Sequence, residues 1–171
     1  MQTIQASPFT TTSFKKVVQE WYHSYDGQPS IEPAELWKLS GPFSAFLTSP
    51  EAQILALQTP FTDDSYSRSI SFPLGESAGL KVVVIGWLPG QCTPIHGHGG
   101  GCLMGVADGQ LLEHRVSPDN HLFVQSESRY YAGAVGYLDD SFAFHDVSNL
   151  GTTASVSVHI YYDPKYDRRI S

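Results

Sequence analysis

Two histidines separated by a single residue carry the first sign of chemistry in this sequence. His96 and His98 follow Pro94 and lead into a glycine-rich stretch. On an extended strand, residues two apart point to the same face, so both imidazoles can address one point in space. This spacing is typical of metal ligands, although an isolated pair could equally be two solvent-exposed or hydrogen-bonded histidines.

A third imidazole ligand has to come from elsewhere in the chain. His145, in the segment Phe-Ala-Phe-His-Asp-Val, lies on another predicted strand, and His159 is its obvious rival. Three neutral imidazoles would leave positions open on a divalent ion, as catalytic metal sites require. Histidines alone accept zinc, nickel, copper or iron, so the residue types leave the metal open.

The last predicted strand, residues 153–162, alternates strictly between apolar and polar side chains. One face carries Ala154, Val156, Val158 and Ile160, and the other carries Ser157, His159 and Tyr161. A hydroxyl, an imidazole and a phenol at two-residue steps can form a hydrogen-bond chain that fixes the histidine tautomer and orients the phenol. Alternation alone favours an outward, solvated polar face, so the pattern leaves the direction of this row undecided.

The first third of the chain is predicted to be helical. Apolar residues recur at helical spacing from Phe14 to Tyr25, behind Thr12 or Ser13 as an N-cap and before Gly27 as a stop. A second short helix is predicted to begin at Pro33 and to carry Leu36 and Leu39, and a third to cover 50–58.

From Tyr66 onward, short segments rich in Val, Ile, Tyr and Phe alternate with Gly, Pro, Asn and Asp. These segments are 66–72, 80–87, 102–107, 110–116, 121–125, 129–132, 135–139, 142–147 and 153–162. Regularly spaced short strands with such turns predict a β-sandwich or barrel. We therefore expect residues 1–171 to form a single domain, with a helical cap over 1–60 and a barrel over 66–165.

Composition excludes several classes of partner. Ten Lys plus Arg against seventeen Asp plus Glu give a net charge of -7 in 171 residues, with no basic cluster. Nucleic acid and anionic membranes are therefore not expected as partners. The two cysteines, Cys92 and Cys102, are too few for a disulfide scaffold, and no apolar run could span a bilayer or form a signal peptide. A cytoplasmic monomer is the expectation.

The spacing around the histidine pair resembles the first motif of the cupin superfamily. That motif is G-x5-H-x-H-x3-E-x6-G. Its positions are matched here by Gly90, His96, His98, Cys102 and Gly109, with Cys102 in place of Glu. His145-x3-Asn149 fits the end of the second motif. The cysteine narrows the likeness to the type I cysteine dioxygenase family of thiol dioxygenases. The other matching segments are Tyr66-Ser67-Arg68, Trp87 before Pro89-Gly90, Gly136-Tyr137-Leu138-Asp139-Asp140-Ser141 and Ser157-Val158-His159-Ile160-Tyr161.

This resemblance implies a mainly β cupin barrel, a double-stranded β-helix of jelly-roll type, with an N-terminal helical cap. It implies Fe(II) held by His96, His98 and His145, and oxidation of the small thiol L-cysteine by O2 to cysteine sulfinate. The alternatives are a dioxygenase for 3-mercaptopropionate or another small thiol, and a non-oxygenase metal-binding cupin. An isomerase or a small-molecule sensor would be examples of the latter.

The resemblance also implies roles for individual residues. Arg68 would pair with the substrate carboxylate, where 3-mercaptopropionate dioxygenases carry Gln, and Tyr66 and Trp87 would line the substrate site. The Ser157, His159 and Tyr161 row would point inward, with His159 behind the ligands rather than on the metal.

Cysteine positions complete the expectations. The resemblance implies a thioether between Cys102 and Tyr161, but the loop from His98 to Cys102 is one residue shorter than in the mammalian enzymes, so Gly101 could occupy that place instead. Cys92 is expected to pack in the interior. His23, His114 and His121 match nothing in the family and are interpreted as surface or structural residues.

Overall fold

The computed structural model describes residues 13–25, 31–73, 79–98, 100–117, 119, 123–138 and 144–162. Its helices are α1 (Ser13–His23), the 3-10 helix η1 (Pro33–Leu39), α2 (Ser40–Leu47) and α3 (Pro50–Gln58). The helices predicted at 13, 33 and 50 are confirmed, and α3 begins where the Ser49 hydroxyl accepts a hydrogen bond from the Ala52 amide at 3.3 Å. Helix α2 was not predicted. Each described helix is too short or too polar to span a bilayer.

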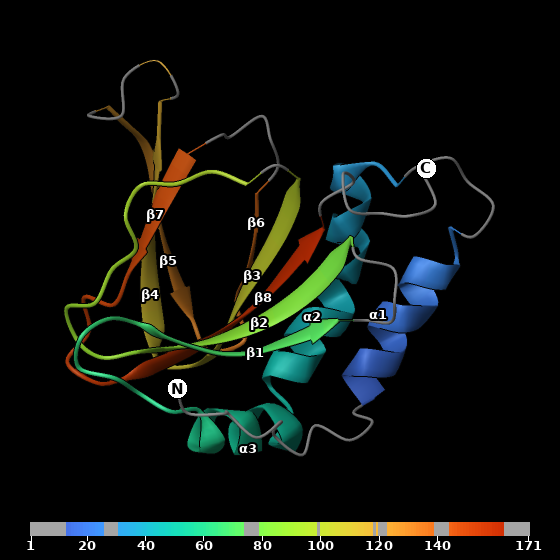
Figure 1. Cartoon of the computed structure of the whole chain (residues 1–171), viewed down its shortest axis with the longest axis horizontal. Helices are drawn as coiled ribbons and strands as arrows, with labels where there is room; N and C mark the ends of the chain where they lie inside the picture. The colour runs from blue at the N-terminus through green and yellow to red at the C-terminus, as the bar shows by residue number, and fades with distance from the viewer. Residues whose placement is uncertain are drawn as a thin grey trace.

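The strands form two sheets. They are β1 (Ser67–Pro73), β2 (Leu80–Trp87), β3 (Gly101–Asp108), β4 (Gln110–Val116), β5 (Val124–Tyr131), β6 (Val135–Leu138), β7 (Phe144–Ser148) and β8 (Ser155–Tyr162). The larger sheet has the order β1-β2-β8-β3-β6 and the smaller one β5-β4-β7. All pairs within the two sheets are antiparallel. Figure 1 shows the two sheets facing each other, with α1 and α2 against the outer side of the larger sheet.

Strand β5 corrects one expectation. The sequence predicts two separate strands at 121–125 and 129–132. The structure instead has one continuous strand from Val124 to Tyr131, and residues 120–122 lie outside the described part of the chain. Among the described strands, β5 pairs only with β4. It is mostly exposed, so its backbone forms the ladder hydrogen bonds while its side chains can stay polar.

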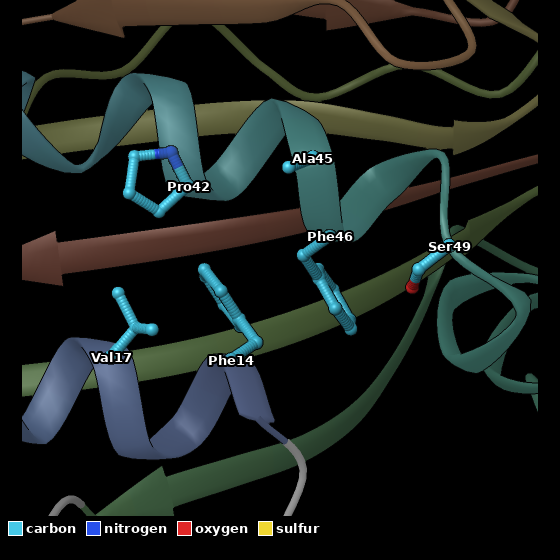
Figure 2. A pocket seen from close by; sticks show the side chains of 6 residues that line it. All are labelled: Phe14, Val17, Pro42, Ala45, Phe46 and Ser49. Atoms are coloured by element: carbon cyan, nitrogen blue, oxygen red, sulfur yellow. The ribbon is translucent and has the colours of Figure 1, made fainter.

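An apolar layer lies between the helices and the larger sheet. Val156, Val158 and Ile160 of β8 contribute to it, together with Phe43 and Leu47 of α2. Phe14 of α1 stacks on Phe46 of α2 with ring centroids 4.4 Å apart. Figure 2 shows Phe14 beside Phe46 at a cavity of about 270 Å³, which is lined by Phe14, Val17, Pro42, Ala45, Phe46 and Ser49.

A second apolar cluster lies between the two sheets. It joins Ile85 and Trp87 of β2, Met104 of β3, Leu111 of β4 and Val147 of β7, among others, and Tyr161 of β8 packs against it. Strand β8 therefore presents its apolar row to the helices and its polar row to the space between the sheets. The predicted sharing of faces on this strand is confirmed, and the polar row points inward.

The contact between α2 and β3 is tight enough to predict a destabilising substitution. A Cβ added at Gly105 would lie 2.3 Å from Leu47 Cδ1 and 2.8 Å from Phe43 Cε1, and both side chains are buried. We expect Gly105→Ala to lower the free energy of unfolding by about 1–3 kcal/mol through overpacking. Urea denaturation measures this.

The matched control is Gly41→Ala in α2, where an added Cβ would meet nothing within 4 Å. The same substitution there should be neutral or mildly stabilising, because alanine favours a helix over glycine. Equal losses of stability at both positions would contradict the packing argument.

Candidate metal centre

Three imidazoles converge at one end of the space between the sheets. His96 and His98 lie on the segment before β3, and His145 lies on β7. One ring nitrogen from each lies within 4.8 Å of the others. His145 is buried, and His96 and His98 are half-buried. This is the set of residues that the sequence predicts as metal ligands.

The backbone holds this group together across a long sequence separation. His96 and His145 exchange two backbone hydrogen bonds, of 2.9 Å and 2.8 Å, as an isolated antiparallel bridge. The Val147 amide also donates to the Thr93 hydroxyl at 2.9 Å. The segment before His96 is thereby fixed to β7, and two histidines distant in sequence become neighbours.

Hydrogen bonds on the outer ring nitrogens fix two of the tautomers. His96 Nδ1 lies 2.9 Å from the Pro94 carbonyl oxygen, and His145 Nδ1 lies 2.9 Å from Glu113 Oε1. Both partners are acceptors, so Nδ1–H donates and the lone pair stays on Nε2 in each ring. His145 Nε2 faces His98 Nε2 at 3.1 Å.

The distance between two of these nitrogens fits a shared divalent metal ion. Two nitrogens that each bind one ion at about 2.1 Å lie about 3.0 to 3.4 Å apart, depending on the coordination angle. The separation of 3.1 Å between His98 Nε2 and His145 Nε2 falls in that range. A neutral set of three imidazoles suits zinc, copper, nickel or iron, and leaves coordination positions for small molecules.

A hydrogen-bonded row on β8 ends beside the histidines. Trp87 Nε1 donates to Ser157 Oγ at 2.8 Å, and Ser157 Oγ lies 2.9 Å from His159 Nε2. His159 Nδ1 then lies 3.2 Å from the Tyr161 hydroxyl. The Tyr161 ring lies 5.0 Å from the His98 ring, centroid to centroid. His159 is therefore outside the three-histidine group and reaches it through Tyr161.

Cys102 lies directly opposite Tyr161. In the antiparallel pairing of β3 with β8, Cys102 is the partner of Tyr161 and Gly101 is the partner of Tyr162. The shorter loop after His98 therefore does not move Gly101 into this place. Cys102 is buried, and burial, with a smaller contribution from Glu113, raises the pKa of its thiol far above the usual value.

The residues predicted to bind substrate lie on the first two strands or, for Tyr66, directly before β1. Arg68 pairs with Ile85 in the register of β1 with β2, and its side chain lies outside the described part of the structure. The Tyr66 ring stacks on the Trp87 indole with centroids 5.0 Å apart and planes 24° apart. Trp87 is fully buried. It therefore both packs against the Tyr66 ring and donates a hydrogen bond to Ser157.

Three further motif residues, Gly90, Gly109 and Asn149, shape the connections between strands. Gly90 and Gly109, at the two ends of the first motif, adopt φ of +83° and +76°. Asn149 is buried and donates to the carbonyls of Trp87 and Thr153 at 3.1 Å and 2.9 Å. These contacts join the end of β7 to the end of β2.

His23, His114 and Cys92 are not part of the three-histidine group. His23 is exposed, and His114 bridges Asp146 and Glu127 at 3.2 Å and 3.3 Å, as structural residues would. His121 lies outside the described residues. The expectation that Cys92 packs in the interior is wrong, because its side chain is exposed. In this extended segment it is the next residue, Thr93, that turns inward and bonds β7.

Glu113 is the site residue that sequence reasoning missed. Its carboxylate is fully buried on β4 and accepts hydrogen bonds from His145, Tyr130 and Arg115. Burial alone would raise the pKa of Glu113, but the hydrogen bond from His145 and the charge of Arg115 hold it below the usual value. In the sequence, Leu111, Glu113 and Arg115 share one face of this strand. Leu112 on the other face is also apolar, and it is buried in the structure, so the sequence does not indicate which face points into the barrel.

Solved structures resemble the barrel of this chain. A Thermus thermophilus protein, TT1209, matches with a TM-score of 0.50 at 17% identity, covering 64% of this chain and 95% of its own. A Klebsiella pneumoniae protein with a double-stranded β-helix domain matches with a TM-score of 0.50 at 20% identity, covering 63% and 84%. An oxalate decarboxylase from Lactobacillus farciminis matches with a TM-score of 0.50 at 17% identity, covering 64% and 32%. At these identities the likeness establishes the cupin fold alone.

A comparison with family models gives the finer assignment. Residues 61–169 match the model of cysteine dioxygenase type I, which covers the barrel and all three histidines of the metal group. That family implies a dioxygenase of thiols on a cupin fold. The protein belongs to the cysteine dioxygenase type I family.

Proposed function

We propose that this protein is an Fe(II)-dependent dioxygenase that converts L-cysteine and O2 to cysteine sulfinate. The proposal rests most directly on one juxtaposition: three neutral imidazoles meet a row of hydrogen-bonded side chains that ends in the Tyr161 phenol, 5.0 Å from the His98 ring. A thiol bound at such a centre would lie next to both the metal ion and the Tyr161 phenol. Cys102 stands where many cupins supply a fourth, anionic ligand, so the ligand set keeps no negative charge of its own.

A metal ion held by His96, His98 and His145 would keep its full positive charge, and the chemistry it would supply is a lowered pKa for a substrate thiol. The chain supplies the rest of the site. Arg68 is proposed to pair with the substrate carboxylate, because a guanidinium fork binds a carboxylate bidentately. Tyr66, supported by its stack on Trp87, is proposed to assist at the same end of the substrate.

We propose one direction of donation along the hydrogen-bonded row on β8. The Trp87 indole N–H can only donate, so Ser157 Oγ accepts it, and the Ser157 hydrogen is proposed to point to His159 Nε2. A neutral His159 then carries its own hydrogen on Nδ1, facing the phenol oxygen of Tyr161. Because the phenol oxygen accepts there, its O–H can donate toward the metal side. Tyr161 is therefore proposed to hydrogen-bond the substrate or the reacting oxygen.

We also propose a thioether between Cys102 and Tyr161. Its formation would join Cys102 Sγ to a ring carbon beside the phenol hydroxyl, remove the thiol hydrogen and one ring hydrogen, and pass an electron pair to O2. The direct pairing of the two residues across β3 and β8 supports it. Intact-mass measurement after turnover should reveal a fraction of protein lighter by those hydrogens, and Cys102→Ser should lack that fraction. Fully active protein of unchanged mass would contradict the cross-link.

The experiment that tests the function is an oxygen-consumption assay on the iron-loaded protein with a panel of small thiols. We expect L-cysteine to give the highest kcat/KM and to incorporate both atoms of labelled O2 into the sulfinate. Arg68→Gln should lower kcat/KM for L-cysteine by about 10- to 100-fold, the effect of losing a charged hydrogen-bond pair. Arg129→Gln, the same substitution at an exposed position on β5, is the matched control.

The possible results separate the alternatives. Turnover of 3-mercaptopropionate without turnover of L-cysteine would overturn the assignment of substrate but keep the reaction class. Iron binding without O2 consumption for any thiol would overturn the dioxygenase proposal and leave a metal-binding cupin of another activity.

A further inference from the structure

The Glu113 side chain is an unusual group to find in the interior of this barrel. It is fully buried on β4, and the neighbouring side chains Leu111 and Val147 are buried and apolar. Removing a carboxylate from water is costly unless charged or hydrogen-bonding partners replace the solvent. The partners of Glu113 therefore indicate what the residue is for.

Three donors occupy the two carboxylate oxygens. Oε1 accepts from His145 Nδ1 at 2.9 Å, and Oε2 accepts from the Tyr130 hydroxyl at 2.9 Å and from Arg115 Nε at 3.3 Å. The Arg115 guanidinium is itself held by a hydrogen bond from Nη2 to the Tyr137 carbonyl at 2.8 Å. The carboxylate is thus fixed on one side by a cation and a phenol, and its other oxygen is directed at a single ring nitrogen.

That ring nitrogen belongs to the most buried of the three candidate ligands. Accepting the Nδ1 hydrogen forces the His145 lone pair onto Nε2, the atom that faces His98 Nε2 at 3.1 Å. A carboxylate behind a metal-binding imidazole fixes its orientation and makes it a stronger donor. Arg115, the cross-strand partner of His145, supplies a compensating positive charge.

We propose that Glu113 is the positioning residue of the metal centre. It holds His145 as an Nε2 ligand and raises the donor strength of the ring, while Arg115 cancels the charge that Glu113 would otherwise add near the metal ion. The inference rests on metal binding by the three histidines and not on the thiol reaction. It can therefore be tested without measuring turnover.

The test uses the full-length protein and Co²⁺, whose affinity is measured by competition with a chromophoric chelator. Glu113→Gln keeps the size of the side chain but removes its charge, and we expect it to weaken Co²⁺ binding by about 10- to 100-fold. Tyr130→Phe removes only one hydrogen bond to Oε2 and should weaken binding less. Glu127→Gln, on the exposed side of β5, is the matched control and should keep the wild-type affinity.

A second measurement distinguishes positioning from a merely structural role. In iron-loaded protein, Glu113→Gln removes a negative charge beside the centre and should raise the Fe(III)/Fe(II) reduction potential. Arg115→Gln removes a positive charge and should lower it. A residue that only filled space would give no such opposite shifts.

Several outcomes would overturn the inference. One is a folded Glu113→Gln variant with wild-type Co²⁺ affinity, and another is a pair of potential shifts in the same direction for Glu113→Gln and Arg115→Gln. If Glu113→Gln fails to fold, Tyr130→Phe decides: a several-fold loss of affinity supports the inference, and wild-type affinity overturns it. Wild-type protein that does not bind Co²⁺ would overturn the metal centre and this inference together, whereas metal binding without thiol turnover would overturn only the proposed function.

Discussion

His145→Ala should abolish metal binding, while His159→Ala should leave metal stoichiometry at the wild-type level. His145 Nε2 is one of the three converging nitrogens, and its loss leaves two half-buried imidazoles that cannot hold a divalent ion tightly. The fall in affinity should exceed the roughly 10- to 100-fold loss expected when only an outer hydrogen-bond partner is removed. His159 belongs to the hydrogen-bonded row on β8, with both ring nitrogens engaged by Ser157 and Tyr161. Metal analysis of purified, iron-loaded variants measures both effects.

The loss of His145 also has a structural effect that a second variant separates. His145→Ala leaves buried Glu113 without one of its donors, which lowers stability as well as removing a ligand. His96→Ala removes a ligand whose Nδ1 bonds a backbone carbonyl, so the Glu113 interactions remain intact. We expect His96→Ala to lose metal while its unfolding transition stays closer to that of the wild type. Metal lost in His159→Ala and kept in His145→Ala would exchange the roles of the two residues.

Tyr161→Phe should lower turnover by about 100-fold or more with little change in metal content. The phenol ring lies beside the ring of His98, one of the three candidate metal ligands, with centroids 5.0 Å apart. A positioned hydrogen-bond donor or proton-transfer group typically contributes about 10²- to 10⁴-fold to a rate. Steady-state kinetics on protein of measured iron content checks this, because any loss can then be assigned to the phenol and not to missing metal.

Two further variants sharpen the result. Tyr162→Phe makes the same change at the next residue, whose side chain belongs to the apolar layer under the helices, and should leave kcat close to the wild-type value. Trp87→Phe removes the hydrogen bond donated to Ser157 at the start of the row and should lower kcat less than Tyr161→Phe does. If Tyr161→Phe turned over L-cysteine at the wild-type rate, the phenol would have no part in the reaction.

Most of the fold was accessible from the sequence because its patterns are local. The helix at Pro50 follows an N-capping serine, and the strand over 80–87 is a nearly continuous apolar run whose ends are marked by glycine and proline. The full extent of strand β5 was not accessible in this way. An edge strand is held by its backbone hydrogen bonds, so its side chains can be polar and then resemble those of a turn. Helix α2 was missed, although its proline falls in the first turn, where a helix tolerates it.

The sequence by itself determined the three metal-ligand candidates and the composition of the Ser157, His159 and Tyr161 row, because motif spacing and strand alternation are properties of neighbouring residues. Only the tertiary structure decided which way that row faces, which residue of β3 lies opposite Tyr161, and that Glu113 stands behind His145. Each of these depends on the pairing and packing of strands far apart in the chain. A shift of one residue in such a pairing would turn every side chain of a strand to its other face, and no local pattern around Glu113 records which face is buried.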